Sequence, residues 1–250
     1  MKYVKYKPDK LLEKHIDFYW VLQTDSKYKP IKVPLFADAC SDIFVNLGSS
    51  PANFNGHPSL QPGRVYIGGI STASCFVTSF PDSTFVGIRF KPGGLPVFYK
   101  LPFVEIVDQI VEFQDKDLAL IADPDELLPE RLDRLFLSKR IQADPFSPIT
   151  EAVNYYKGQI SVDLLARNCN ISTRTLERLF YINLGISPKE FIGIVKFRRV
   201  LKILQEAHSK GKLLEIALEM GYYDHAHLTR EIKKHSGLPP SAIWPGPSFP

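Results

Sequence analysis

The sequence contains few cysteines and no long hydrophobic run. Its 250 residues include three cysteines, too few and too widely spaced for a disulfide framework or a zinc knuckle. No segment approaches the ~18 consecutive apolar residues of a membrane span, since glycine, serine and threonine interrupt the best candidate, residues 67–80. The first eight residues, MKYVKYKP, lack the apolar block of a secretion signal. We therefore expect a reduced, cytoplasmic protein with no membrane partner.

The chain also lacks a strong overall charge, but the charge it has is unevenly distributed. It contains 31 Lys and Arg against 27 Asp and Glu, a net charge of +4. Residues 146–250 hold 14 of the basic and 9 of the acidic residues, a net charge of +5, and the remainder has a net charge of −1. A local positive excess indicates an anionic partner, although many domains without such a partner carry as much charge.

The first hundred residues consist of short apolar runs separated by turn residues. The runs are rich in Phe, Val, Ile and Tyr, and the turns contain Gly, Pro and Asn. This pattern predicts strands at residues 16–23, 43–47, 65–70, 74–80 and 84–90. Strands of this length and spacing are typical of an antiparallel barrel or sandwich, and the pattern does not distinguish the two.

The apolar period changes after residue 100. Apolar residues then recur at three- and four-residue steps, which predicts helices at 103–111 and 125–139. The segment Asp144–Pro148 is predicted to be a linker because each of its prolines disfavours helix in the preceding residue. We therefore expect an α+β protein with a boundary near residue 145. Residues 1–145 would form a barrel- or sandwich-like β-rich domain with helices near its C-terminal end, and residues 146–250 an all-α domain.

Helix start signals are clear in residues 146–250. Four residues of the N-cap type precede runs of helix formers: Ser161, Ser172, Ser187 and Asp224. Ser187 is followed by Pro188 at the first helical position and by Glu190 at the spacing of a capping box. The helix that begins there is expected to reach about residue 207. Gly221 marks a turn between a short helix at 213–219 and the last N-cap. The layout predicts two helix-turn-helix units joined by a long helix.

The second helix of each unit has one apolar and one polar face. In the first unit, Leu176, Leu179 and Phe180 face the core, and the outward residues are Arg174, Thr175 and Arg178. In the second unit, Leu228 and Ile232 face the core, and the outward residues are His225, Ala226, Thr229, Arg230 and Lys233, with His227 at the margin. Such a helix fits the ~12 Å major groove, where arginine binds guanine or phosphate.

Ordinary solvated helix faces would have a similar composition. The interpretation as recognition helices therefore depends on the presence of two helix-turn-helix units. Leu176 and Leu228, the equivalent core positions, lie 52 residues apart, with the long helix between the two units. This separation allows two recognition helices to lie about one DNA turn, ~34 Å, apart on the same face.

The C-terminal 105 residues resemble the DNA-binding domain of AraC/XylS-type transcription regulators. The matching segments are STRTLERLF at 172–180, GISPKEF at 185–191, IA at 216–217, GYYDHAHLTRE at 221–231 and GLPP at 237–240. The resemblance implies that Arg174, Thr175 and Arg178 lie on the first recognition helix and that His225, Ala226, His227 and Arg230 lie on the second. Lys189, at the start of the long helix, is better placed for the DNA backbone.

The N-terminal half is similar to the β-rich domain of one branch of this family. The similarity rests on DIFVNLG at 42–48 and GIRFKPGG at 87–94. It implies a domain that senses an effector or mediates dimerisation. The implied partners are double-stranded DNA, RNA polymerase and a small-molecule effector, and the implied assembly is a monomer or a homodimer.

We identify no catalytic residue, metal ligand or cofactor motif. His15 and His57 are the only histidines of the first half, and a metal site would need several. Spacing identifies no general base for Cys40 or Cys75, so we interpret both as structural thiols. The alternative function is a small-molecule-binding or cysteine-reactive protein, an alkyl acceptor that the basic domain delivers to DNA.

Two charged pairs in the first half also need an interpretation. Asp38 and Asp42 flank Cys40, and we interpret them as turn residues. Arg89 and Lys91 alternate along a predicted strand, where they would either bind an acidic effector or be exposed charges of an edge strand.

Overall fold

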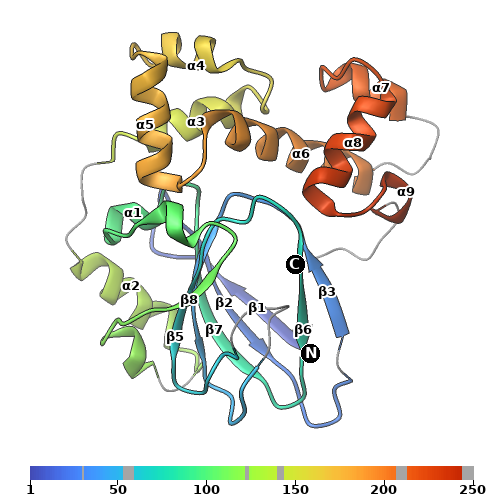
Figure 1. Cartoon of the computed structure of the whole chain (residues 1–250). Coiled ribbons are helices and arrows are strands. Elements are labelled where there is room, and N and C mark those ends of the chain that lie inside the picture. Colours follow the sequence, from blue (N-terminus) through green and yellow to red (C-terminus); the bar gives the residue numbers. More distant parts are fainter. Residues whose placement is uncertain (30, 53–58, 122–123, 140–143, 207–212, 244–250) are drawn as a thin grey trace.

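The computed structural model of the chain consists of a β-rich half and a helical half (Figure 1). It describes all residues except 30, 53–58, 122–123, 140–143, 207–212 and 244–250. The described strands are β1 Lys2–Tyr6, β2 Ile16–Gln23, β3 Ile31–Leu35, β4 Ser41–Asn46, β5 Val65–Gly68, β6 Cys75–Ser79, β7 Thr84–Phe90 and β8 Ile110–Glu112. Six of them form one sheet in the order β1-β2-β7-β4-β5-β8, and β3 pairs with β6 in a second sheet. All pairs are antiparallel, as predicted.

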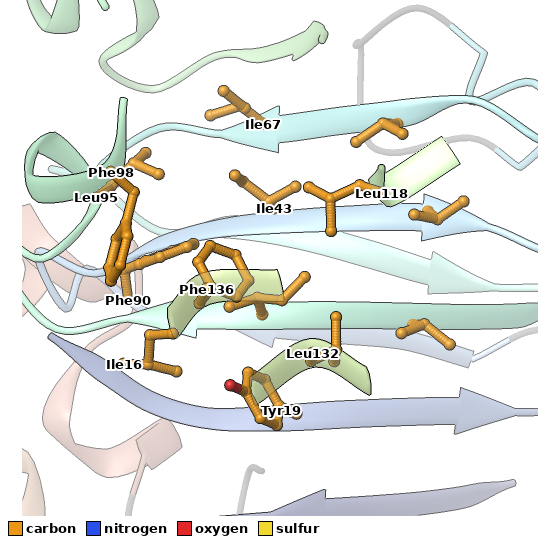
Figure 2. Packing of buried hydrophobic residues seen from close by; sticks show 14 of the residues in the cluster. Ile16, Tyr19, Ile43, Ile67, Phe90, Leu95, Phe98, Leu118, Leu132 and Phe136 are labelled. Carbon is orange, nitrogen blue, oxygen red and sulfur yellow. The ribbon is translucent and has the colours of Figure 1, made fainter. Parts of the chain in front are cut away.

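The large sheet has a different apolar cluster on each face. One face, with Tyr19, Ile43 and Ile88, packs under helix α2, whose Leu132 and Phe136 point at the strands (Figure 2). The other face carries a second cluster that includes Phe44, Tyr66 and Phe85. The alternation of side chains along each strand produces this division.

Strand β7 is followed by α1 Leu95–Phe98 and η1 Phe103–Ile106, and β8 is followed by η2 Leu118–Leu120 and α2 Leu128–Ser138. Helix α2 confirms the helix predicted at 125–139 within a few residues. The helix predicted at 103–111 is wrong. Only η1 is helical there, and it ends at its C-cap Val107, whose ψ of 131° is not helical. Asp108, with a φ of +56°, also departs from helical geometry. Residues 110–112 instead form β8, whose backbone pairs with β5.

The sequence pattern also missed two strands, β1 and β3. Strand β1 contains two lysines in KYVKY, and β3 contains a proline, so neither has the apolar density that predicts the others. The two strands predicted at 16–23 and 84–90 have the bounds of β2 and β7. The strands predicted at 43–47, 65–70 and 74–80 overlap β4, β5 and β6.

The second half is helical, as predicted. Its helices are α3 Ser147–Tyr155, α4 Val162–Asn168, α5 Thr173–Leu184, α6 Pro188–Glu206, α7 Leu213–Glu219, α8 His225–Ser236 and α9 Pro240–Ile243. The predicted linker is shorter than expected, because α3 already begins at Ser147. Asp144 accepts hydrogen bonds from the backbone N–H groups of Phe146 and Ser147 at 3.2 and 2.8 Å, and Pro148 lies in the first turn of the helix. The end expected for α6 near residue 207 lies outside the described residues.

Candidate DNA-binding interface

Helices α4 and α5 form the first helix-turn-helix unit. Ser161 and Ser172 are the N-caps of the two helices, and their hydroxyl oxygens accept from the backbone N–H groups of Leu164 and Thr175 at 3.2 and 3.1 Å. Leu176 and Phe180 of α5 are fully buried, in the core that also contains Leu165 and Ala166 of α4. The local caps fix where each helix begins, and this core fixes which face of α5 is left for solvent.

The outward face of α5 carries two free arginines. Arg174 and Arg178 are exposed, and neither forms an ion pair with an acidic residue in the described part of the chain. Thr175 is half-buried, and its hydroxyl lies 2.9 Å from the Ser172 hydroxyl. The guanidinium groups of the two arginines therefore remain exposed to solvent, whereas Thr175 takes part in the helix cap.

Helices α7 and α8 repeat this arrangement. Asp224 caps α8, and its carboxylate accepts from the backbone N–H of His227 at 2.6 Å. Leu228 and Ile232 are buried against Ile216, Ala217 and Met220, as predicted. The exposed residues of α8 include His225, Ala226, His227, Arg230 and Lys233. The second unit therefore has the same geometry as the first: an N-capped helix with a buried apolar stripe and a basic outer face.

Two residues of the predicted second face also have contacts within the protein. Thr229 is half-buried, and its hydroxyl donates to the backbone carbonyl of His225 at 2.7 Å. The ring of His227 lies edge-on to the ring of Tyr222, with 5.2 Å between their centres. His227 is thus at the margin of the face, as expected.

The long helix α6 joins the two units and starts in a capping box. The Ser187 N–H and hydroxyl donate to the Glu190 carboxylate at 2.9 and 2.6 Å, and the Glu190 N–H donates back to Ser187 at 3.2 Å. These donors hold the pKa of Glu190 below its usual value. Lys189 is exposed in the first turn, where an ammonium group can reach a phosphate.

Sequence reasoning missed Lys196, which connects α6 to the second unit. Its Nζ lies 3.9 Å from the centre of the Tyr222 ring and donates to the backbone carbonyl of Gly221 at 3.3 Å. Burial lowers the pKa of Lys196. A cation held over an aromatic ring is stabilising, so this contact fixes the turn before α8 to the connecting helix. No sequence motif marks it, because the partners are about 25 residues apart in the chain.

A substitution of Gly221 would test the role of the turn before α8. The φ of Gly221 is +66°, and a Cβ atom there would have no neighbour closer than 3.5 Å, so a substitution is strained by the backbone rather than by a clash. We expect Gly221→Val to lower the free energy of unfolding by about 1–2 kcal/mol and to weaken DNA binding by misplacing α8. Urea unfolding and DNA titration of the full chain would measure both effects.

Gly63 supplies a matched control for this substitution. It has a φ of +69°, and a Cβ atom there would have no neighbour within 4 Å. Gly63→Val should therefore cause a similar loss of stability and leave DNA binding unchanged. If Gly221→Val and Gly63→Val have the same effect on DNA binding, the role given to this turn is wrong.

The environment of the cysteines disfavours the alternative function. Burial raises the pKa of Cys40 to about 12 and also raises the pKa of Cys75. A thiol that stays protonated at neutral pH is a poor nucleophile. The described residues contain no group of three or more His, Cys, Asp and Glu side chains placed to hold a metal ion, and His57 lies outside them. No described helix is long and apolar enough to span a bilayer.

Arg89 is neither an edge-strand charge nor open to an acidic effector. It lies on β7, inside the large sheet, and pairs with both Asp38 and Asp42; the distance to Asp42 is 2.7 Å. Asp38 also accepts from the backbone N–H of Cys40 at 3.0 Å, as expected for a turn residue. Asp42 lies within strand β4, so its interpretation as a turn residue is wrong. Lys91 is exposed beyond the strand and donates to the backbone carbonyl of Glu13. The interpretation of Arg89 as an exposed charge is therefore wrong.

Comparison with known protein families agrees with this geometry. A model described as a helix-turn-helix domain matches residues 165–243, and a model described as a domain of unknown function, DUF6597, matches residues 4–112. Residues 165–243 are therefore similar to a helix-turn-helix domain, and residues 4–112 are similar to the DUF6597 domain.

Two curated relatives match the chain over part of their length. The lactose operon transcription activator of Staphylococcus xylosus is 28% identical over 113 residues, which cover 43% of this chain and 39% of that protein. An uncharacterized HTH-type transcriptional regulator of Haemophilus influenzae is 31% identical over 80 residues, which cover 32% and 26%. The chain thus spans less than half the length of these relatives.

The solved structures to which the chain is similar include those of two regulators. ToxT from Vibrio cholerae has a TM-score of 0.49 at 12% identity, covering 91% of this chain and 99% of that chain. A transcriptional regulator with an AraC-type DNA-binding domain from Chromobacterium violaceum has a TM-score of 0.37 at 22% identity, covering 40% and 88%.

Proposed function

We propose that this protein is a sequence-specific DNA-binding transcription regulator that inserts α5 and α8 into successive major grooves of one duplex. The observation that carries the proposal is the duplicated geometry. Each unit presents an N-capped helix whose apolar stripe is buried and whose basic side chains, Arg174 and Arg178 in one and Arg230 and Lys233 in the other, are exposed. Helix N-termini and arginine side chains are the groups that proteins use to contact phosphates and base edges.

The proposal assigns a role to each part of the chain. Residues 146–250 would bind DNA, with Lys189 on the phosphate backbone and His225, Ala226 and His227 near the bases. Residues 1–145 would sense an effector or mediate dimerisation, and the protein would have no catalytic activity of its own. RNA polymerase and a small-molecule effector are the further partners that we propose, and the assembly would be a monomer or a homodimer in the cytoplasm.

The salt dependence of DNA binding tests this proposal. The full chain is used to enrich a duplex from a random pool, here called the selected duplex, and its dissociation constant is measured from low to moderate salt. With ~6–8 phosphate contacts, we expect log K to fall with log salt at a slope of roughly −5 to −7. Failure to enrich any sequence, or binding that does not respond to salt at low ionic strength, would exclude the proposed function.

A further inference from the structure

Both recognition helices end against the β-rich half of the chain. Helix α5 is followed by Gly185 and helix α8 by Gly237, with φ of +76° and +68°. A Cβ atom at Gly185 would lie 2.5 Å from the Phe103 carbonyl oxygen in η1, and one at Gly237 would lie 2.8 Å from the Ser74 hydroxyl. Both helices therefore point their C-terminal ends toward the β-rich half and their N-terminal ends away from it (Figure 1).

The contact at α8 includes a specific hydrogen bond. His235, in the last turn, is 3% exposed, and its Nδ1 lies 3.1 Å from the backbone carbonyl oxygen of Thr72, which can only accept. Burial lowers the pKa of His235, so the ring is neutral at neutral pH with its proton on Nδ1. Phe197 of α6 packs against the His235 ring, and Phe36 of the β-rich half packs edge-on against Phe197.

Asp108 holds Thr72, the residue whose carbonyl contacts the end of α8. The two carboxylate oxygens of Asp108 accept from the backbone N–H and the hydroxyl of Thr72, each at 2.7 Å. Its own N–H donates to the carbonyl of Ile70 at 2.9 Å. Asp108 lies two residues after η1, the element that meets the end of α5. Residues 103–108 therefore contact one recognition helix directly and the other through Thr72.

This arrangement bears on how the two helices reach DNA together. Simultaneous insertion into successive grooves requires the helices to hold one relative position, and any freedom between them must be lost on binding. We propose that the β-rich half fixes the relative position of the two recognition helices by holding their C-terminal ends, with Asp108 as the positioning residue for the α8 contact. The inference rests on the proposed function.

Asp108→Gly is the direct test. The substitution removes both bonds to Thr72 and adds no strain, because glycine adopts a φ of +56° readily. Asp82→Gly is the matched control: Asp82 is exposed, has a φ of +52°, and lies beyond the opposite end of β6 from Thr72. Asp108→Asn keeps one acceptor oxygen and should fall between Asp108→Gly and the unchanged chain.

DNA affinity is measured for the full chain on the selected duplex and on a half-duplex. The half-duplex is a shortened form of the selected duplex that contains the major-groove site of only one recognition helix. We expect Asp108→Gly to weaken binding to the selected duplex on the order of tenfold and to leave half-duplex binding unchanged. Asp82→Gly should change neither. Unchanged or tighter binding of Asp108→Gly to the selected duplex would overturn the inference. Equal losses of affinity on both duplexes would show that the contacts of a single helix had been damaged, and this result would also overturn the inference.

Amide hydrogen exchange tests the α8 contact without DNA. Asp108→Gly should speed exchange in the last turn of α8, up to Gly237, and Asp82→Gly should not. Unchanged exchange in that turn would overturn the inference even if the protein binds DNA as proposed. If the unchanged chain binds no DNA while exchange responds as expected, the proposed function fails and the contact between the two halves stands.

Discussion

Replacing both Arg174 and Arg178 with alanine should weaken binding to the selected duplex by at least about 30-fold. Each bidentate contact of arginine with a base discriminates by ~1–3 kcal/mol, so the loss of two costs roughly 2 kcal/mol or more. Both side chains are exposed and have no acidic partner among the described residues, so no internal rearrangement offsets the loss. A scrambled duplex should lose far less, because it offers only phosphates. Titrations of both duplexes by the full chain would measure the difference.

Lys189→Ala is the control for this measurement. Lys189 is exposed at the start of α6, away from the outer face of α5, and its ammonium group is suited to a phosphate. Its removal should weaken binding to both duplexes equally and reduce the salt slope by about one. If the double arginine variant weakens both duplexes equally as well, the two arginines only contact phosphate, and base reading would have to come from α8.

Phe180→Ala should lower the free energy of unfolding by about 3–5 kcal/mol, the largest effect on stability that we expect. Phe180 has no exposed surface and packs edge-on against Phe146, with 4.9 Å between ring centres, and against Phe191 at 5.5 Å. Phe146 in turn lies against Gly93, where a Cβ atom would be 2.5 Å from its ring. Truncation therefore opens a cavity where the first unit contacts the β-rich half. Urea unfolding followed by circular dichroism would measure the change.

Tyr181 provides a matched control, because it is the next residue on α5 and half of its surface is exposed. Tyr181→Ala should change stability by less than about 0.5 kcal/mol. A small effect of Phe180→Ala, comparable to that of Tyr181→Ala, would mean that the core of the first unit is not packed as the structure shows.

The sequence predicted best those features that depend on neighbours in the chain. The caps of α4, α5, α6 and α8 involve residues at most three positions apart, so Ser161, Ser172, Ser187 and Asp224 identify the helix starts without knowledge of the fold. The apolar spacing of α5 and α8 likewise identifies their outward residues, since a helix places residues three and four apart on one face. Strands β2 and β7 were predicted for a similar reason, because their dense apolar and aromatic composition is local.

The features that the sequence misassigned depend on distant segments. Residues 110–112 have a helical apolar spacing, yet they form β8 because β5 offers backbone groups to pair with. The strand pattern alone predicts an exposed Arg89, but segments about 50 residues away bring Asp38 and Asp42 to it. In both cases the stabilising interaction is with residues that lie close by only in the folded chain.

The sequence by itself therefore determined the α+β class, the two helix-turn-helix units and the basic outer faces of α5 and α8. Only the tertiary structure decided how these units are held. The ends of α5 and α8 meet Phe103 and Ser74, and His235 bonds to Thr72 across more than 160 residues of chain. Helix caps and periodic faces are formed by hydrogen bonds and spacing within one or two turns, so sequence specifies them directly. Contacts between the two halves form only where the fold brings their surfaces together, and no local pattern encodes that proximity.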